Sequence, residues 1–147
     1  MAKRRSDAGA PLRVLVEAAK GLAHPARLRL LGMLASGELC VCQMTAVLGL
    51  APSTVSQHLS VLARGGLVAE RKEGKLVFYR LHLEGPGAAL RAALLEQLAP
   101  DPVARADRAE IARLRRIPVA TLCAADLDLV AIGVRKSAAA PRMPASA

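Results

Sequence analysis

Three cysteines, Cys40, Cys42 and Cys123, are the residues of this chain most able to do chemistry. Thiolates bind soft metal ions and metalloids, and two neighbouring thiols can be oxidised to a disulfide. Free cysteine also packs as a small hydrophobic residue, and Cys123, in an apolar stretch, suits packing as well as ligation. Cys40 and Cys42 are separated by one residue within the pentapeptide ELCVC, which packing alone does not account for. We therefore treat this pair as candidate ligands.

The pair lies at the start of a short apolar helix expected over residues 41–48. On a regular helix, residues two positions apart project about 200° from each other. Both thiolates can bind one ion only if the first turn is not helical, or stops being helical when the ion binds. Ion binding is therefore expected to distort the start of this helix.

A second helix is expected from Pro52, because Val55, Leu59 and Leu62 recur at the spacing of one buried stripe. Small hydroxyl, amide and imidazole groups elsewhere on the helix suit base edges in a DNA major groove, and arginine suits a phosphate. These candidate DNA-binding residues are Ser53, Thr54, Ser56, Gln57, His58, Ser60 and Arg64.

Gly49 is a helix stop signal and Pro52 suits the first position of the next helix, so the two helices form a helix-turn-helix. After it, the apolar period changes from 3.6 to 2. Residues 67–71 and 76–81 are expected to be strands and residues 72–75 their turn, which together make a β-hairpin wing. Arg71, Lys72 and Lys75 on this wing suit contact with DNA phosphates.

The whole segment resembles the ArsR/SmtB family of winged helix-turn-helix, metal-responsive repressors. STVSQHLSVLARGGLV resembles the family's recognition helix, the hairpin ending FYRL its wing, and GLAHPARLRLLGML the helix that precedes the motif. The resemblance covers residues 12–98. It implies a mainly α fold with a two-stranded β-wing, and a homodimer formed through the first helix and the helix after the wing. It also implies double-stranded operator DNA with an inverted repeat as the partner.

ELCVC resembles family members that bind soft ions through thiolates, among them arsenite, antimonite, cadmium and lead repressors. Trivalent arsenic and antimony take three thiolates in a pyramidal arrangement. Some arsenite repressors place the third cysteine three residues after the second, but here that residue is Thr45. Cys123 is the remaining thiol, from the same or the partner subunit. Alternatively two thiolates suffice, which suits a methylated trivalent arsenical.

Two other effector types fit the sequence less well. The cadmium and lead repressors recruit cysteines from the N-terminal arm, and residues 1–20 contain none. The family's zinc site on the helix after the wing needs two histidines, but His82 is the last histidine of the chain. We therefore expect As(III) or Sb(III) as the effector, with no permanently bound cofactor.

Composition agrees with a nucleic-acid partner and an intracellular location. The chain has 147 residues, and 21 Lys and Arg against 12 Asp and Glu give a net charge of +9. An odd cysteine count without a secretory signal favours a reducing cytoplasm. No stretch reaches the roughly 18 uncharged apolar residues that a membrane span needs.

We expect four segments along the chain. Residues 1–11 form a flexible basic arm and residues 12–100 the DNA-binding and dimerisation domain. Residues 101–136 form a partly helical extension, and residues 137–147, rich in Ala, Pro and Ser, a disordered tail.

Two alternatives to an arsenic-responsive repressor remain. The same DNA reader could respond to Cd(II), Pb(II), thiol oxidation or persulfide, with Cys40 or Cys42 joining Cys123 in a disulfide or polysulfide link. A small thiol reductase is the more distant alternative. The sequence lacks Cys-x-x-Cys, a phosphate-cradling glycine loop and a nucleophile with a base, so we do not expect an enzyme.

Overall fold

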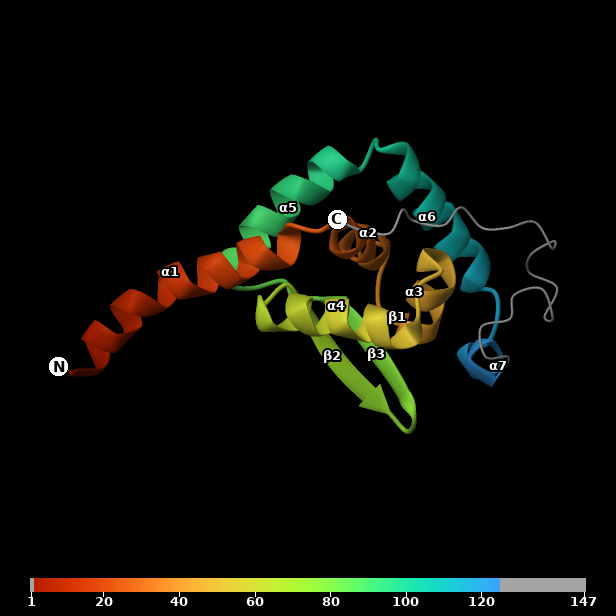
Figure 1. Cartoon of the computed structure of the whole chain (residues 1–147), viewed down its shortest axis with the longest axis horizontal. Helices are drawn as coiled ribbons and strands as arrows, with labels where there is room; N and C mark the ends of the chain where they lie inside the picture. The colour runs from red at the N-terminus through yellow and green to blue at the C-terminus, as the bar shows by residue number, and fades with distance from the viewer. Residues whose placement is uncertain (1, 125–147) are drawn as a thin grey trace.

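A computed structural model of the chain describes residues 2–124, with side-chain detail from residue 12. The elements are α1 (Ala2–Leu22), α2 (Pro25–Leu34), β1 (Leu39–Cys40), α3 (Val41–Leu48), α4 (Pro52–Arg64), β2 (Val68–Glu73), β3 (Leu76–Leu81), α5 (Pro86–Leu98), α6 (Pro102–Leu114) and α7 (Val119–Ala124). Figure 1 shows α1 and α5 at one end, α4 and the wing along one side, and α6 and α7 at the other end. The fold is mainly α with a small antiparallel wing, as expected.

The helix-turn-helix forms as its local signals predict. Gly49 takes a left-handed conformation (φ 67°) after α3, and its N–H donates to the carbonyl of Thr45 at 3.0 Å. Pro52 occupies the first position of α4. Val55, Leu59 and Leu62 are fully buried, so α4 has one apolar face toward the core and one polar face outward.

The wing has a tighter turn than the sequence predicts. Glu73 pairs with Leu76, so Lys72 and Glu73 belong to β2 and only Gly74 and Lys75 form the turn. Gly74 has φ 59°, the left-handed conformation that a two-residue hairpin turn requires. The sheet also has a third strand that the sequence analysis missed. The two residues of β1 pair antiparallel with β3, Leu39 opposite Tyr79 and Cys40 opposite Phe78.

One apolar core joins the helices, and it includes residues from beyond position 100. Leu30, Leu31 and Met44 are fully buried in it, while Ile111, Leu114 and Leu122 bring α6 and α7 into the same cluster. These two helices therefore pack on the helix-turn-helix. A division of the chain at residue 100 stays a prediction.

The N-terminal segment, expected to be a basic arm, is helical. Helix α1 runs from Ala2 to Leu22, so residues 2–11 belong to the same helix as the start of the expected domain, and their flexibility stays a prediction. Alanine, lysine and arginine, frequent in this segment, are good helix formers. The disordered tail expected over residues 137–147 lies outside the described residues.

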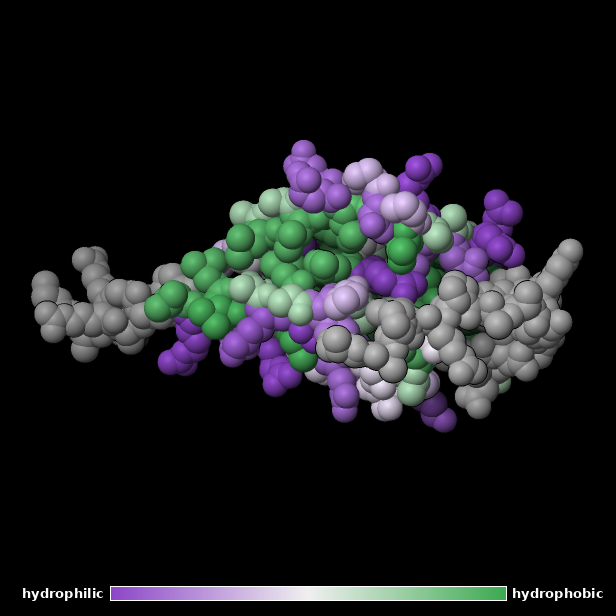
Figure 2. Space-filling model, turned by 45° about the horizontal axis from the view of Figure 1, so that its top comes forward, coloured by the Kyte–Doolittle hydropathy of each residue, from purple (hydrophilic) through white to green (hydrophobic). Residues whose placement is uncertain are grey.

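An exposed apolar surface runs over α1 and α5, and appears green in Figure 2. Leu12 is 71% exposed, and Val16, Leu90 and Leu94 are between 38% and 43% exposed. Both helices also pack against each other within the chain. Across residues 2–124, none of the helices has the length and apolar character to cross a membrane.

Candidate metal centre and nucleic-acid interface

Cys40 is the last residue of β1 and immediately precedes α3. Its backbone is extended (φ −75°, ψ 148°), and its N–H donates to Oε1 of Gln43 at 2.8 Å, which holds the first turn of α3 in place. Because Cys40 is extended and Cys42 is helical, the two thiols are not bound by the 200° separation of a regular helix. The backbone thus meets the condition that the sequence sets for a shared ligand site.

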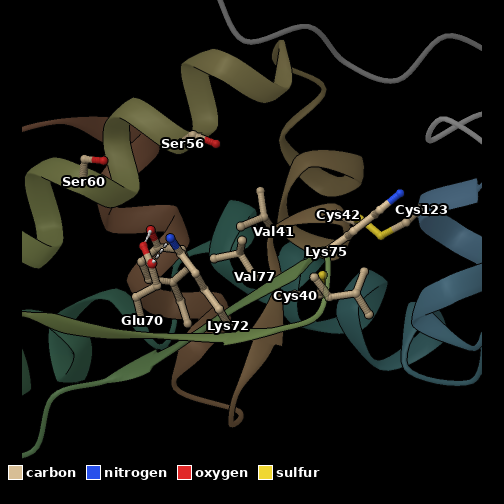
Figure 3. A pocket seen from close by; sticks show the side chains of 12 residues that line it. Cys40, Val41, Cys42, Ser56, Ser60, Glu70, Lys72, Lys75, Val77 and Cys123 are labelled. Carbon is tan, nitrogen blue, oxygen red and sulfur yellow. Dashed lines mark hydrogen bonds and ion pairs between the residues drawn. A yellow bond between two sulfur atoms is a disulfide. The ribbon is translucent and has the colours of Figure 1, made fainter.

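Cys123, on α7, completes the cluster from the same chain. Cys42 and Cys123 form a disulfide across 81 residues of sequence, with Cα atoms 5.8 Å apart. Cys40 is a buried free thiol beside them. The three Sγ atoms lie within 4.8 Å of one another, and Figure 3 shows the disulfide with Cys40 close to it. The structure therefore brings together all three predicted ligand residues.

This cluster supports two kinds of chemistry. In the oxidised form, Cys42 and Cys123 are covalently joined and only Cys40 is available as a ligand. Reduction of the disulfide by two electrons gives three neighbouring thiols, which as thiolates are donors for a soft, thiophilic ion. Cys40 is buried, whereas Cys42 and Cys123 are half-buried. Reagents therefore reach the disulfide-forming pair more readily than Cys40.

The cluster opens into a cavity of about 520 Å³ between α4 and the wing. Beyond the cysteines, Ser56 and Ser60 of α4 line it on one side, and Lys72 and Lys75 of the wing on the other. All four are predicted DNA-contacting residues (Figure 3). The cysteine cluster and the predicted DNA-reading surface therefore border the same cavity.

Most predicted DNA-binding residues of α4 lie on its outer face. Ser53, Ser56, Gln57, Ser60 and Arg64 are exposed, and Thr54 is half-buried at the start of the helix. Ser56, Gln57, Ser60 and Arg64 also border a shallow cavity of about 490 Å³. The exposed side of α4 is therefore polar and accessible over three turns.

His58 has a different position from these residues. It is half-buried, its ring centroid lies 4.4 Å from that of His24, and Nη1 of Arg27 lies 3.4 Å from its Nδ1. Burial, then the charges of His24 and Arg27, lower the pKa of His58, and burial and Arg27 lower the pKa of His24. His58 thus contacts Arg27 of α2 and His24, the residue that caps the start of α2. Its contact with DNA stays a prediction.

Arg71 is engaged within the protein. Its guanidinium donates to Glu38 at 2.6 Å and to Glu73 at 2.8 Å, and lies 4.6 Å from the ring centroid of Phe78. The hydrogen bond from Arg71 holds the pKa of Glu38 below its usual value. Glu38, which is near enough in sequence to cap α3, instead joins the segment before β1 to the wing.

The two wing lysines, Lys72 and Lys75, are less constrained by protein contacts than Arg71 is. Lys72 is 73% exposed and lies 3.7 Å from Glu70, a distance that allows only a loose ion pair. Lys75 is exposed at the hairpin turn. Both side chains are thus available for phosphate contact.

Sequence reasoning missed three contributors to the site. Gln43 caps the turn at Cys40, and the spacing Cys-x-x-Gln resembles a capping box with a thiol in place of the usual hydroxyl. Strand β1 is only two residues long, which is too short for a periodic signal. The ion pair between Glu38 and Arg71 depends on strand pairing that no local pattern encodes.

Comparison with known proteins gives a consistent result. Residues 24–70 match the family described as "Bacterial regulatory protein, arsR family". An arsenic resistance transcriptional regulator of Pseudomonas putida is 43% identical over 68 residues, covering 46% of this chain and 53% of the relative. A biofilm growth-associated repressor of Agrobacterium fabrum is 50% identical over 62 residues, covering 42% of this chain and 53% of the relative. The chain spans about half the length of the curated relatives it matches.

Solved structures extend the match over the fold. HlyU from Vibrio cholerae aligns with a TM-score of 0.51 at 37% identity, covering 62% of this chain and 95% of that chain. The repressor BigR from Xylella fastidiosa aligns with a TM-score of 0.53 at 34% identity, covering 67% and 96%. A Mycobacterium bovis domain, described as a homodimeric winged helix-turn-helix DNA-binding domain, gives a TM-score of 0.53 at 34% identity, covering 64% and 85%.

The fold and these matches define a winged helix-turn-helix protein. More specifically, the chain belongs to the ArsR family of bacterial regulatory proteins. The matched family and these relatives are described as regulatory proteins, which argues against the thiol reductase alternative.

Proposed function

We propose that this protein is a cytoplasmic DNA-binding repressor that leaves its operator when trivalent arsenic or antimony binds the thiolates of Cys40, Cys42 and Cys123. The observation that carries the proposal is the approach of the three Sγ atoms to within 4.8 Å at the start of α3. Three thiolates match the pyramidal coordination of As(III) and Sb(III). Relatives named as arsenic resistance regulators support this choice of effector.

DNA binding is supported by the charge and shape of the α4 side of the molecule. The net charge of +9 favours a polyanion. Helix α4 presents exposed hydroxyl, amide and guanidinium groups, which suit base edges and phosphates in a major groove. Lys72 and Lys75 on the wing would lie along the adjacent backbone.

A homodimer is supported by the exposed apolar residues of α1 and α5. Leu12, Val16, Leu90 and Leu94 form a surface that a second copy would cover. A two-fold dimer places two recognition helices about one DNA turn apart, so the operator would be an inverted repeat.

The positions of the cysteine ligands explain how an effector would release the protein from its operator. Cys40 and Cys42 flank the junction between β1 and α3, and α3 packs directly on α4. A ligand that draws the two thiolates together with Cys123 would favour one arrangement of this junction. If DNA favours another, effector and operator weaken each other reciprocally, with a coupling of about 1 to 3 kcal/mol.

A second candidate trigger, thiol oxidation, is favoured by the disulfide between Cys42 and Cys123. In this reaction the two thiols lose two electrons and two protons to an oxidant such as a polysulfide, and one S–S bond forms. The product joins α7 to α3 and removes two of the three ligands. Cd(II) and Pb(II) are the remaining alternatives, although only three thiols are available to them.

Fluorescence anisotropy on DNA from the protein's own promoter tests the proposal. Reduced wild type, Cys42→Ser and Cys123→Ser are titrated with arsenite. We expect arsenite to release wild type and not Cys42→Ser, while the Cys123→Ser curve decides between three and two thiolates. Release by a polysulfide without response to arsenite would replace the trigger and keep the DNA reader. Release by neither, or by Cd(II) alone, would contradict both candidates.

A further inference from the structure

Helix α6 has a buried face that combines apolar residues with one carboxylate. Ala104, Asp107, Ile111 and Leu114 follow one another at intervals of three, four and three residues, so they lie on one side of the helix. All four are at most 4% exposed. Asp107 is the only carboxylate among the buried residues of the part of the chain that the structure describes. A buried charge of this kind needs a partner.

The partner is Arg29 of α2. Its Nε donates to Oδ2 of Asp107 and its Nη2 to Oδ1, both at 2.7 Å. The side chains are 17% and 6% exposed. Two parallel hydrogen bonds between a planar guanidinium and a planar carboxylate fix both distance and orientation. The pair therefore has one favourable alignment of α6 on α2.

The apolar contacts of the same face define this alignment less sharply. A stripe with alanine, isoleucine and leucine can pack on an apolar surface after a shift of one helical turn, about 5.4 Å. A buried ion pair often adds little net stability, because desolvation opposes the attraction, but it can specify register. Stability alone thus does not account for Arg29 and Asp107.

The alignment of α6 is transmitted to Cys123. The link from α6 to α7 is short and is hydrogen-bonded at each end, from Ile117 N–H to the carbonyl of Leu114 at 3.0 Å after α6 and from Leu122 N–H to that of Pro118 at 3.1 Å at the start of α7. A displaced α6 therefore carries α7 with it. The Cα atoms of Cys42 and Cys123 are 5.8 Å apart, and a disulfide tolerates only about 4.4 to 6.8 Å. A shift of one turn would take Cys123 out of the cluster.

We propose that Arg29 and Asp107 are positioning residues that set the register of α6 and thereby deliver the third thiol to Cys40 and Cys42. The ion pair acts on the sensor and not on the DNA reader. The inference rests on the proposed function where it treats Cys123 as an effector ligand. The structural part of the inference is that the ion pair holds Cys123 next to Cys42. This part applies whether the trigger is a metalloid or thiol oxidation.

The test replaces the charges without opening a hole in the core. Arg29→Met combined with Asp107→Leu gives an apolar pair of similar size, which preserves burial and removes the alignment. Arg29→Asp combined with Asp107→Arg restores an ion pair in reverse. Arg105→Gln, an exposed position on α6, is the matched control.

The main measurement is the equilibrium between the Cys42 and Cys123 thiols and their disulfide in a glutathione redox buffer, followed by alkylation and mass spectrometry. We expect the apolar pair to lower the disulfide equilibrium constant about tenfold or more, with partial recovery in the reversed pair and no change in Arg105→Gln. Operator affinity of the reduced apolar variant should stay within about threefold of wild type. Titration of the thiols of the reduced apolar variant at saturating arsenite should leave one thiol, that of Cys123, free.

Two results would overturn the inference. If the apolar pair forms the disulfide as readily as wild type, the ion pair does not set the register. If the apolar pair loses operator affinity along with the disulfide, Arg29 and Asp107 support the whole fold and have no specific positioning role. The redox measurement uses neither arsenite nor DNA. Failure of the arsenite response in wild type therefore contradicts the proposed effector and leaves this test valid.

Discussion

The two ends of the helix-turn-helix core are held by different forces. Helix α4, which carries the polar reading face, is fixed by three fully buried aliphatic side chains at Val55, Leu59 and Leu62. Helices α6 and α7, which carry the third thiol, also bury three aliphatic side chains, at Ile111, Leu114 and Leu122, and are held in addition by a buried ion pair and a disulfide. Apolar packing holds regardless of redox state, whereas the sulfur link depends on it. We therefore expect the position of α4 to be independent of redox state, and the position of α7 to change when the disulfide is reduced.

Salt is the strongest way to separate the two ends. If each dimer contacts about 6 to 10 phosphates, operator affinity should fall about 10³- to 10⁵-fold between 50 and 200 mM salt, because counterions are released on binding. Anisotropy at several salt concentrations measures the slope. The Cys42–Cys123 redox equilibrium, measured at the same salt concentrations, should change little. A flat salt response of DNA binding would contradict the assigned reading surface.

Truncation of the core at the reader end should affect both ends. Leu59→Ala removes a fully buried side chain, so the free energy of unfolding should fall by about 2 to 5 kcal/mol in urea denaturation. Operator binding should weaken with it. Leu122→Ala is the matched variant in α7. We expect it to lower the equilibrium constant for disulfide formation while the reduced protein keeps its operator affinity. Equal loss of DNA binding in both variants would remove the contrast.

Substitutions on the DNA surface sharpen the roles within the reader. Gln57→Ala should cost about 1 to 3 kcal/mol of operator binding and relax sequence preference, because an amide can read a base edge. Lys75→Ala should weaken binding to all sequences alike, because we expect a lysine at the hairpin turn to contact phosphate. Competition between operator and random DNA measures both effects. Equal loss of discrimination in the two variants would contradict the assignment.

The smallest expected effect is a pH dependence at the junction of α2 and α4. The pKa values of His24 and His58 are lowered in the folded protein, so the unfolded chain binds protons first as pH falls. Their contribution to stability is complete above the unfolded pKa of about 6.5 and is lost as pH falls through the window below it. Urea denaturation between pH 5.5 and 7.5 measures this. His58→Gln should reduce the slope, and an unchanged slope would show that other groups cause it.

Local signals explain why the reader could be predicted from the sequence. Gly49, Pro52 and the stripe of α4 each specify their conformation within a few residues, and the structure confirms all three. The hairpin strands were predicted for the same reason. The turn was predicted two residues too long, because Lys72 and Glu73 are polar strand residues on an exposed wing.

The thiol end depends on contacts between distant residues. The sequence identifies three cysteines but not the fold after Pro118, and so not whether Cys123 comes from the same chain. Its place follows from Arg29 and Asp107, which are 78 residues apart, and from burial of Ile111 and Leu122. Strand β1 likewise exists only because β3 lies beside it. No periodic pattern encodes such pairs.

Strand β1 gives the thiol cluster a mechanical connection to the wing. Cys40 pairs with Phe78 on β3, the strand that continues into the hairpin, and Arg71 on β2 lies opposite the same phenylalanine. The cysteines and the lysines of the hairpin therefore lie close together, around one cavity. A displacement of Cys40 would pass through Phe78 to the strand that begins next to Lys75. Under the proposed function, an effector at the cysteines would thus act on the hairpin through β1 as well as on the recognition helix through α3.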